Sequence, residues 1–294
     1  MISFLIPIFN YDITSLVDEI IRSAEYAQVE YEILAYDDGS NVNFCKVKNA
    51  VLEQMPKVKY KLLEKNIGRS AIRNLLAKDA QGEWFCFVDC DSGLNNNIEF
   101  VKNYIDNSKE QDIICGGRIY KPFEKVEKDF VLHWKSGVER ENINSQKHKP
   151  AFLTCNFFIR KKVFDEIKFD ENIKQYGHED TIFGIMLEQK DYKVLYINNP
   201  VIHLDLKNTE RFLSDTRKAQ ENLKHLYLQP QYKNLLKNLR IIKAYNFLRK
   251  IYMDKVFLCF AFLMKPFVLW RLKIENPSLV LLDFYKLYIF IKTK

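Results

Sequence analysis

Two acidic pairs are the groups in this sequence best suited to do chemistry. Asp89 and Asp91 follow an apolar run, Trp84–Val88, and Glu179 and Asp180 are adjacent. If the run is a strand, its two-residue period places the carboxylates of Asp89 and Asp91 on one side of the backbone. Two such carboxylates repel each other, and a divalent cation relieves the repulsion. Their oxygen atoms suit Mg²⁺ or Mn²⁺, which share coordination with substrate phosphates. The alternative is a solvated turn with two surface acids.

The usual glycine-rich phosphate-binding loops are missing. The sequence contains no Gly-x-x-x-x-Gly-Lys-Ser/Thr, and no Gly-x-Gly-x-x-Gly follows the first apolar run. A nucleotide must therefore be held by other means, such as a metal, arginines and a carboxylate that contacts the base. Two segments offer such groups: Asp37-Asp38-Gly-Ser, and residues 66–74, which contain Arg69 and Arg73. For Arg69 the alternative to phosphate binding is a charge on the protein surface.

Strand-like and helix-like patterns alternate through the first hundred residues, and these elements must position the acids. Apolar runs of strand length occupy residues 2–8, 31–36, 58–63 and 84–88, while residues 12–27, 42–54 and 68–79 have helical spacing. Such alternation with short connections predicts a mostly parallel sheet covered by helices on both faces. Ligands bind at the carboxyl ends of the strands in these sheets, which is where the acidic segments lie.

The pattern is looser after residue 95. We expect strands at 112–120, 152–159, 193–197 and 201–203, helices at 161–167 and 179–189, a loop or helix insertion at 121–149, and only helices from residue 209 on. The chain therefore divides into residues 1–95 and 96–208, two halves of one α/β domain, and a helical tail at 209–294.

Composition excludes several classes of protein. The 294 residues are 47% hydrophobic and 28% charged, which argues against a disordered chain. The six cysteines lack paired zinc-site spacing, so we expect buried thiols in a reducing cytoplasm. The first residues contain no basic group and reach Pro7 quickly, which is unlike a signal peptide.

The tail is basic and apolar. Residues 233–294 contain 13 Lys and Arg and three acids, a charge of +10, whereas the preceding residues sum to −3. The apolar run at 256–264 is shorter than the roughly 20 residues that cross a bilayer, and Lys265-Pro266 is expected to interrupt it. We predict helices that lie on an anionic membrane surface. A packed helical subdomain and a homodimer interface are the alternatives, and no nucleic-acid-binding motif accompanies the charge.

Taken in order, the motifs resemble family 2 glycosyltransferases with the GT-A fold, a Rossmann-like α/β fold with a mostly parallel central sheet. The motifs are Pro7-Ile-Phe-Asn, Asp37-Asp-Gly-Ser, Asn66-x-Gly…Arg73-Asn, Asp89-x-Asp and Gly177-His-Glu-Asp. The second half is similar to the galactosyltransferase and chondroitin-polymerase type, in which the segment at 155–164 precedes Phe169-Asp170, the Glu-Asp pair and a downstream histidine, here His203. The resemblance spans about residues 1–205 and leaves the tail outside.

The resemblance implies a role for each matching residue. Residues 1–95 would bind a nucleotide sugar, with Pro7 and Phe9 shaping the base and ribose pocket and Asp37 accepting a hydrogen bond from the base, usually uracil. Arg73 would lie near the pyrophosphate. The remaining implied donor-site residues are Asp38, Asn66, Gly68 and Asp89.

Residues 96–208 would supply acceptor binding and catalysis. The resemblance implies that Asp180 is the general base, that Glu179 hydrogen-bonds the acceptor, and that Asn156 and His178 also contact it. Asp89, Asp91 and His203 would hold Mn²⁺ or Mg²⁺. His178 stands where relatives usually carry a small residue, and Ile72 also replaces a small residue, so the acceptor pocket and the packing of one helix are expected to differ.

The expected function is a metal-dependent inverting glycosyltransferase of surface polysaccharide synthesis. It would move a sugar from a nucleotide-diphosphate sugar, with UDP favoured, to a hydroxyl of a glycan or lipid-linked glycan at the cytoplasmic face of the membrane. One alternative is a sugar-nucleotide nucleotidyltransferase, which would need a glycine-rich loop where residues 10–14 have no glycine. Another is a catalytically idle membrane-docking protein with the same fold.

Overall fold

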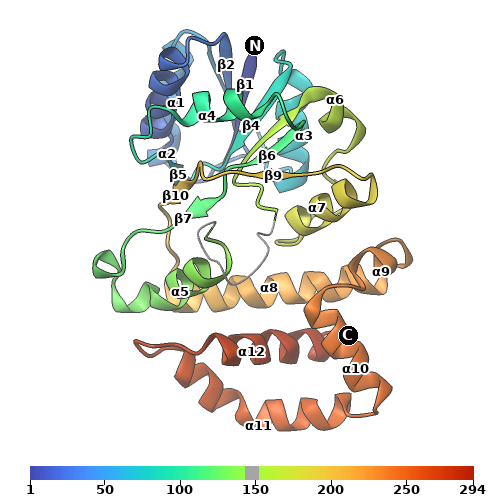
Figure 1. The fold of residues 1–294 in the computed structure, drawn as a ribbon. Helices are drawn as coiled ribbons and strands as arrows, with labels where there is room; N and C mark the ends of the chain where they lie inside the picture. Colours follow the sequence, from blue (N-terminus) through green and yellow to red (C-terminus); the bar gives the residue numbers. More distant parts are fainter. Residues whose placement is uncertain (143–151) are drawn as a thin grey trace. The chain divides into compact units, whose positions relative to one another are not determined.

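The computed structural model describes residues 1–142 and 152–294, which form two compact units. The sheet unit comprises Met1–Lys121, Val138–Lys174 and Glu179–Asp205, and the helical unit comprises Pro122–Gly137, Gln175–His178 and Leu206–Lys294 (Figure 1). Two short segments from the middle of the chain therefore belong with the tail. The division of the sheet unit at residue 95 stays a prediction. Part of the expected insertion, residues 143–149, lies outside the described residues.

The sheet unit is built on a seven-stranded sheet in which the N-terminal strands are parallel. Its strand order is β3 (Val58–Leu62), β2 (Tyr31–Asp37), β1 (Ile2–Ile8), β4 (Trp84–Val88), β8 (Asn156–Arg160), β6 (Ile113–Cys115) and β9 (Leu195–Tyr196). Strand β8 runs antiparallel to β4 and β6, and β9 is parallel to β6. The predicted mostly parallel α/β sheet is confirmed.

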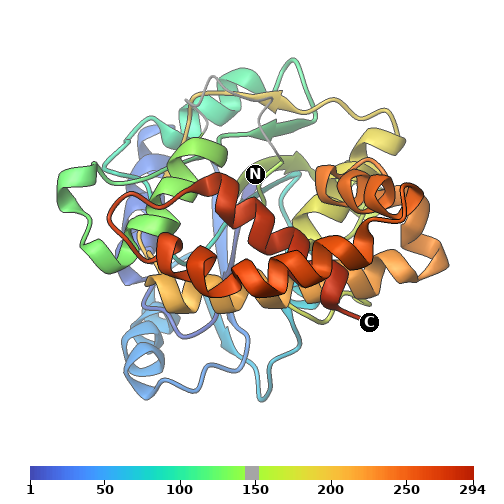
Figure 2. The same cartoon turned by 90° about the horizontal axis from the view of Figure 1, so that it is seen from below.

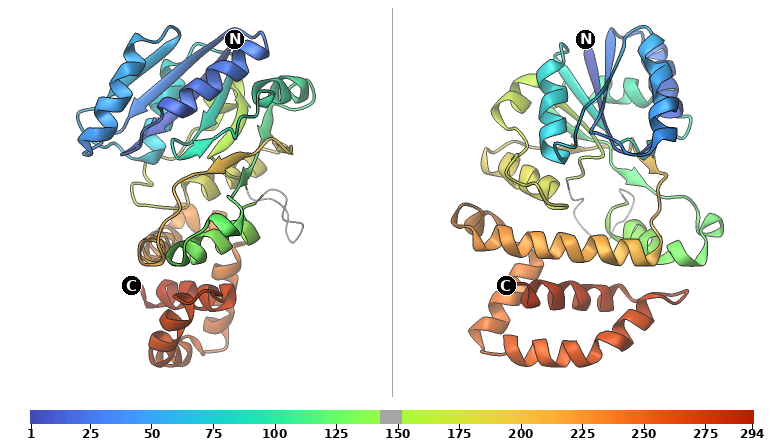
Figure 3. Two further views of the ribbon diagram at one scale, coloured as in Figure 1. Left: turned by 90° about the vertical axis from the view of Figure 1, so that its left-hand side faces the viewer. Right: turned by 180° about the vertical axis from the view of Figure 1, so that it is seen from behind.

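Helices cover both faces of this sheet (Figure 3). Along β1, Phe4 and Ile6 pack in the core formed with α1 (Thr14–Tyr26) and α4 (Phe100–Asn107), whereas Leu5 packs in the core formed with α3, α6 (Lys161–Glu166) and α7 (Glu179–Gln189). Helix α3 spans Arg69–Asp79. The alternation follows from the two-residue period of a strand, and it places α3 and α7 on one face.

A small three-stranded sheet brings distant residues together. Its order is β5 (Ser92–Gly93), β10 (Val201–His203) and β7 (Arg118–Ile119), with His203 opposite Ser92 and Val201 opposite Arg118. The single strand expected at 112–120 is therefore wrong, because β6 and β7 belong to different sheets. The chain turns between them at Gly117, whose positive φ of 77° favours glycine.

Other elements differ from expectation mainly in extent. Residues 42–54 form α2 (Asn43–Asn49) followed by a 3₁₀ turn, η1 (Ala50–Gln54), instead of one helix. The strand expected at 152–159 begins only at Asn156, and that expected at 193–197 is reduced to β9. All six cysteines are free, and Cys259 is exposed although burial was expected.

Asn156, at the start of β8, is a fully buried polar side chain that connects three parts of the sheet unit. Its Oδ1 accepts a hydrogen bond from the Tyr104 hydroxyl at 2.5 Å. Its Nδ2 donates to the carbonyl oxygens of Gly117 and Asn199, each at 2.9 Å. The amide is thus satisfied entirely within the fold.

The tail is helical, as its periodicity predicts, and its helices pack against one another, which is the alternative to helices that lie separately on a membrane. The elements of the helical unit are the 3₁₀ turns η2 (Phe123–Lys125) and η3 (Lys128–Phe130), most of α5 (Val131–Arg140), and helices α8 (Thr209–Leu228), α9 (Pro230–Leu236), α10 (Arg240–Lys250), α11 (Asp254–Leu272) and α12 (Leu279–Lys292). Helix α12 contacts both α8 and α11. None of the helices in the described ranges is long and apolar enough to cross a membrane.

The expected interruption at Lys265-Pro266 is wrong, because α11 continues through Pro266 to Leu272. Proline in a helix removes one N–H donor and usually costs about 3 kcal/mol. Buried side chains on both sides of Pro266, among them Ala261 and Val268, pack in the core shared with α12 and hold the helix together.

The Asn156 contacts generate a stability prediction. Asn156→Ala removes the partner of the buried Tyr104 hydroxyl and of the Asn199 carbonyl oxygen, whereas the Gly117 carbonyl oxygen keeps the Val201 N–H. We therefore expect the free energy of unfolding to fall by at least about 2 kcal/mol. Asn43→Ala, at an exposed position of α2, is the matched control and should change it by less than about 0.5 kcal/mol. Urea denaturation measures both, and equal values for the two variants would contradict the assignment.

Candidate active site

The loop before α3 is held by the end of β2. Asp38, which is buried, accepts hydrogen bonds from the backbone N–H groups of Ile67 at 2.6 Å and Gly68 at 3.1 Å. Gly39 packs so closely that a Cβ atom there would lie 2.7 Å from the backbone nitrogen of Asn66. Gly68 has a positive φ of 94° and immediately precedes α3. The Asp38-Gly39 pair therefore fixes where α3 begins.

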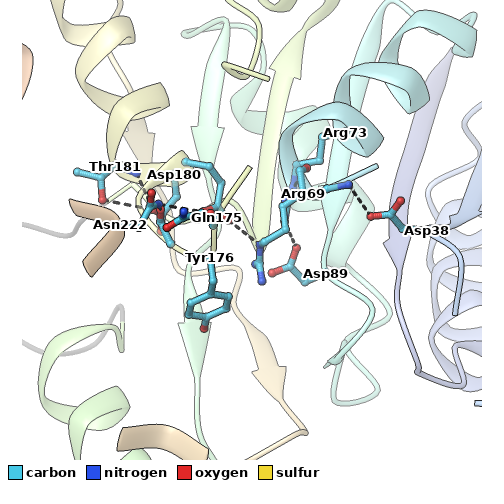
Figure 4. A network of polar contacts seen from close by, with 12 residues as sticks. Asp38, Arg69, Arg73, Asp89, Gln175, Tyr176, Asp180, Thr181 and Asn222 are labelled. Carbon is cyan, nitrogen blue, oxygen red and sulfur yellow. Dashed lines mark hydrogen bonds and ion pairs between the residues drawn. The ribbon is translucent and has the colours of Figure 1, made fainter. Parts of the chain in front are cut away.

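The first turns of α3 place Arg73 against the carboxylate of Asp89. Arg73 Nη2 lies 2.6 Å from Asp89 Oδ1, and the Arg73 side chain is only 2% exposed (Figure 4). Arg118, on β7, lies 3.7 Å from the other oxygen of Asp89. Because two guanidinium groups already neutralise Asp89, it is poorly available as a metal ligand.

Arg69, one turn earlier on α3, pairs with the second acidic group. Its Nε lies 2.6 Å from Glu179 Oε1, and Glu179 is buried. Burial raises the pKa of Glu179, but the charges of Arg69 and Arg73 more than offset this and hold it below its usual value. Residues four apart share a helix face, so α3 connects the two acidic pairs of the sequence. Arg69 is therefore more than a surface charge.

Asp180 behaves differently from its neighbour. The Asp180 side chain is half-buried and accepts hydrogen bonds from the Thr181 N–H at 2.6 Å and the Thr181 hydroxyl at 3.2 Å. Burial, followed by the negative charge of Glu179, raises the pKa of Asp180 to about 6. Glu179 is thus ionised at neutral pH, while Asp180 can take up a proton at a pH close to neutral.

Asp91 and His203 form a third polar group, brought together by the pairing of β5 with β10. His203 Nδ1 lies 3.6 Å from Asp91 Oδ2, and His203 is buried. Burial raises the pKa of Asp91, but the close His203 imidazole and the charge of Arg118 more than offset this and leave it well below its usual range. Asp91 Oδ1 is buried and lacks a hydrogen-bond partner within the part of the chain that the structure describes.

These residues fit a metal ion only in part. Residues 1–142 and 152–294 contain no cluster of three His, Cys, Asp or Glu side chains arranged to hold one. Asp91 and His203 offer two ligands, and the unsatisfied oxygen of Asp91 is a suitable donor. The sequence-based set of three ligands is not assembled, because Asp89 faces Arg73 and Arg118.

The residues expected around the nucleotide lie at the carboxyl ends of β1 and β2 and in the loop between β3 and α3. Pro7 is half-buried and Phe9 is 48% exposed, as a side chain at a binding surface would be. Asp37 is fully buried and accepts hydrogen bonds from the Ser40 N–H at 2.8 Å and the Tyr60 hydroxyl at 3.3 Å. Asn66 is exposed. The contact of Asp37 with a base stays a prediction, as do the roles of Asp38 and Gly68, whose observed contacts shape the loop.

The residues expected at the acceptor site are separated. Asn156 has no exposed surface and supports the sheet, so we do not keep it in the proposed site. His178 belongs to the short segment Gln175–His178 of the helical unit and has a positive φ of 74°. Its contact with an acceptor stays a prediction.

Sequence reasoning missed Arg118 and Tyr11. Arg118 reaches Asp89 only because β7 pairs with β10, and no motif surrounds it in the sequence. Burial and the nearby charges of Asp91 and Asp205 raise the pKa of Tyr11 to about 12. The position of Arg69, one helical turn before Arg73, does indicate in the sequence that the two side chains lie on the same side of the helix.

The Arg69–Glu179 contact makes a prediction about proton binding. Arg69→Ala removes the nearest positive charge, so the pKa of the Glu179 carboxyl should rise by about one unit or more. The measurement is a pH titration of ¹³C-labelled carboxyl groups by NMR. The exposed Arg22→Ala variant is the control. An unchanged Glu179 titration in Arg69→Ala would contradict the contact.

Comparisons with known proteins identify the family of the chain. The model of the family described as glycosyl transferase family 2 matches residues 3–168. A Bacillus subtilis protein named minor teichoic acid biosynthesis protein GgaB is 24% identical over 284 residues, covering 96% of this chain and 30% of its own length. The chain thus spans about a third of that relative. The glycosyltransferase GlyG of Streptococcus pneumoniae is 26% identical over 215 residues, 68% of each chain.

Solved structures share the fold. The mannosyltransferase PcManGT of Pyrobaculum calidifontis, in complex with GDP-Man and Mn²⁺, aligns with 80% of this chain and 67% of its own at a TM-score of 0.57 and 12% identity. S. aureus TarS 1-349 aligns with 99% of this chain and 90% of its own at a TM-score of 0.50 and 16% identity. With the family model covering more than half of the chain, this chain belongs to glycosyl transferase family 2 and has the GT-A fold.

Proposed function

We propose that this glycosyltransferase moves a sugar from a nucleotide-diphosphate sugar, UDP-linked by preference, to a hydroxyl group of an acceptor glycan with inversion at the anomeric carbon. The observation that carries the proposal is the opposite shift in pKa of the neighbouring carboxyl groups of Glu179 and Asp180. Glu179 is held ionised by Arg69, while the pKa of Asp180 is raised to about 6. A carboxylate with a pKa just below neutral is well suited to accept a proton in catalysis.

In the proposed reaction, Asp180 takes the proton from the acceptor hydroxyl. The freed oxygen forms a bond to the anomeric carbon while the bond from that carbon to the diphosphate oxygen breaks. The electron pair of the broken bond leaves with the diphosphate. Because the nucleophile attacks on the side opposite to the leaving group, the configuration inverts. Glu179 stays ionised and accepts a hydrogen bond from a second acceptor hydroxyl.

Arginines beside Asp89 supply positive charge for the diphosphate. Arg73 and Arg118 both lie against Asp89, and Arg118 also lies 3.4 Å from Glu141, so two guanidinium groups are held in place there by two carboxylates. The planar guanidinium fork suits paired phosphate oxygens. Arg73 is locked by Asp89 and by the carbonyl oxygen of Arg69 at 3.1 Å, which means that it is already oriented before the donor binds.

We also propose that a divalent ion, Mn²⁺ or Mg²⁺, binds at the same site with Asp91 and His203 as its two protein ligands. Such an ion supplies charge stabilisation for the departing diphosphate. Mg²⁺ usually keeps several waters and binds through one or two carboxylates plus substrate phosphates, so two protein ligands suffice. The buried oxygen of Asp91, which has no hydrogen-bond partner among residues 1–142 and 152–294, supports this choice. PcManGT, which has the same fold, is described with GDP-Man and Mn²⁺.

The acceptor that we propose is a cell-surface glycan or its lipid-linked precursor. GgaB, which matches 96% of this chain, is named for minor teichoic acid biosynthesis. A lipid-linked acceptor places the reaction at the inner face of the cell membrane, and the basic tail, with a charge of +10 over residues 233–294, agrees with such a location.

Replacing the proposed base tests the reaction. Asp180→Asn keeps the shape and the Thr181 contacts but cannot accept the proton, so sugar transfer should fall by about 10²–10⁴-fold. Donor binding should persist, measured as thermal stabilisation by a panel of UDP-glucose, UDP-galactose, UDP-N-acetylglucosamine and GDP-mannose. The exposed Asp165→Asn is the control. Full transfer activity in Asp180→Asn would contradict the role of Asp180.

The pH dependence of the wild type distinguishes a base from a structural carboxylate. Because Asp180 must be ionised to accept a proton, kcat/KM should fall as the pH drops through about 6. In Asp180→Asn the residual activity should lose this limb of the profile. A limb of the same midpoint in both proteins would assign the titration to another group.

Metal dependence is tested by chelation and by the two proposed ligands. EDTA should abolish transfer and Mn²⁺ should restore it. Asp91→Asn and His203→Gln should each weaken Mn²⁺ binding in the presence of UDP by at least about tenfold, measured by electron paramagnetic resonance. His225→Gln, an exposed histidine on α8, is the control. Wild-type Mn²⁺ affinity in both ligand variants would exclude this pair as the metal site.

A further inference from the structure

Helix α11 carries large apolar side chains on its exposed side as well as on its buried side. Ala261, Val268 and Leu272 lie in the core shared with α12. The opposite side forms what we call the outer stripe, in which each member is about half exposed or more: Val256 (54%), Phe260 (55%), Leu263 (75%), Phe267 (48%) and Trp270 (59%). Their spacing of four, three, four and three residues places them on one face of the helix.

The end of α10 and the turn after it continue this apolar surface. Phe247 is 61% exposed, Tyr252 is 88% exposed, and Ile251 and Met253 are also exposed. Figure 2 views the helical unit from the side of α11, which crosses the unit as an uninterrupted helix. A contiguous group of large apolar side chains in water is costly and usually marks a docking surface.

Basic residues surround the outer stripe. Arg249, Lys250 and Lys255 lie near the N-terminal end of α11, and Arg271 and Lys273 lie near its C-terminal end. Asp254 is the single acid within α11. The surface therefore combines bulky aliphatic and aromatic side chains with positive charge, as interfacial membrane helices do.

Charge decides between the two occupants that an apolar face of this kind could have. In a symmetric dimer the same surface patch meets itself, so the basic residues of the two copies would be brought together and repel each other. An anionic bilayer offers the opposite: lipid phosphates for the lysines and arginines, and acyl chains for the outer stripe. None of the described helices is suited to cross a membrane, so the helix would lie in the plane of the interface.

We propose that the outer stripe of α11, together with the end of α10, inserts into the headgroup region of an anionic bilayer. Trp270 and Tyr252, whose rings are both large and polar at one edge, lie at the boundary between headgroups and acyl chains. The inference rests on the membrane location proposed above for a lipid-linked acceptor. The contacting surface is thereby identified, and its apolar part consists of side chains that are about half exposed or more, of which Phe260 also touches Phe284 of α12 edge-on.

Vesicle sedimentation tests the proposal with the full chain. The wild type should sediment with vesicles that contain phosphatidylglycerol and bind phosphatidylcholine vesicles much more weakly. The combined variant Phe260→Ser, Leu263→Ser and Trp270→Ser should bind the anionic vesicles at least about 100-fold more weakly, because three large apolar groups no longer leave water. The matched control is Phe44→Ser with Val47→Ser, two residues of α2 that are 65% and 75% exposed. It should bind like the wild type.

The alternative occupants give different results. A wild type that ignores anionic vesicles, but forms a concentration-dependent dimer that the triple variant loses, would overturn the proposal in favour of a second copy. Equal vesicle binding by the triple variant and the wild type would overturn it as well. Circular dichroism and thermal unfolding verify that the variants fold, which is expected because all three positions are exposed.

Failure of this inference can be told apart from failure of the proposed reaction. With the nucleotide sugar of the panel that serves as donor, the triple variant should transfer the sugar to a water-soluble acceptor at the wild-type rate. Asp180→Asn should sediment with vesicles like the wild type. Loss of vesicle binding without loss of transfer isolates the membrane surface, whereas loss of transfer without loss of vesicle binding isolates the chemistry.

Discussion

Two arginines one turn apart on α3 neutralise two acids that come from separate parts of the chain. Arg73 pairs with Asp89 at the end of β4, and Arg69 pairs with Glu179 at the start of α7, both at 2.6 Å. A buried charge left without its partner typically costs about 3–5 kcal/mol, so each pair constrains where the other elements can lie. The face of the sheet that carries α3 and α7 is arranged around these two contacts.

Because of these arginine contacts, neighbouring acids in the sequence have different environments. Glu179 pairs with Arg69 and stays ionised, while Asp180 accepts hydrogen bonds from Thr181 and lies close to the negative charge of Glu179. A similar division separates Asp89, which faces two arginines, from Asp91, which faces His203. In each pair one carboxylate forms ion pairs with arginine that hold secondary-structure elements together, and the other remains available to bind a proton or a metal ion. That is the physical basis for giving catalysis to Asp180 and metal binding to Asp91.

The strands and helices that carry these groups could be predicted because their patterns are local. β1, β4, β10 and α7 have the expected bounds, since apolar periodicity and flanking turns define them. The contacts of Arg118 could not be predicted, because they depend on which distant strands pair in the small sheet. Asn156 was assigned to the acceptor from a family motif, although its buried amide holds the sheet together. Pro266 shows the same limit, since tertiary packing overrides a helix-breaking residue.

A crystal structure with Mn²⁺ and the nucleotide sugar that stabilises the chain most would test the central claim most directly. The account predicts that the diphosphate contacts Arg73 or Arg118, that the metal binds Asp91 and His203, and that the anomeric carbon is open to attack from the side of Asp180. A donor bound with its diphosphate away from α3, or with its sugar facing away from Asp180, would contradict it.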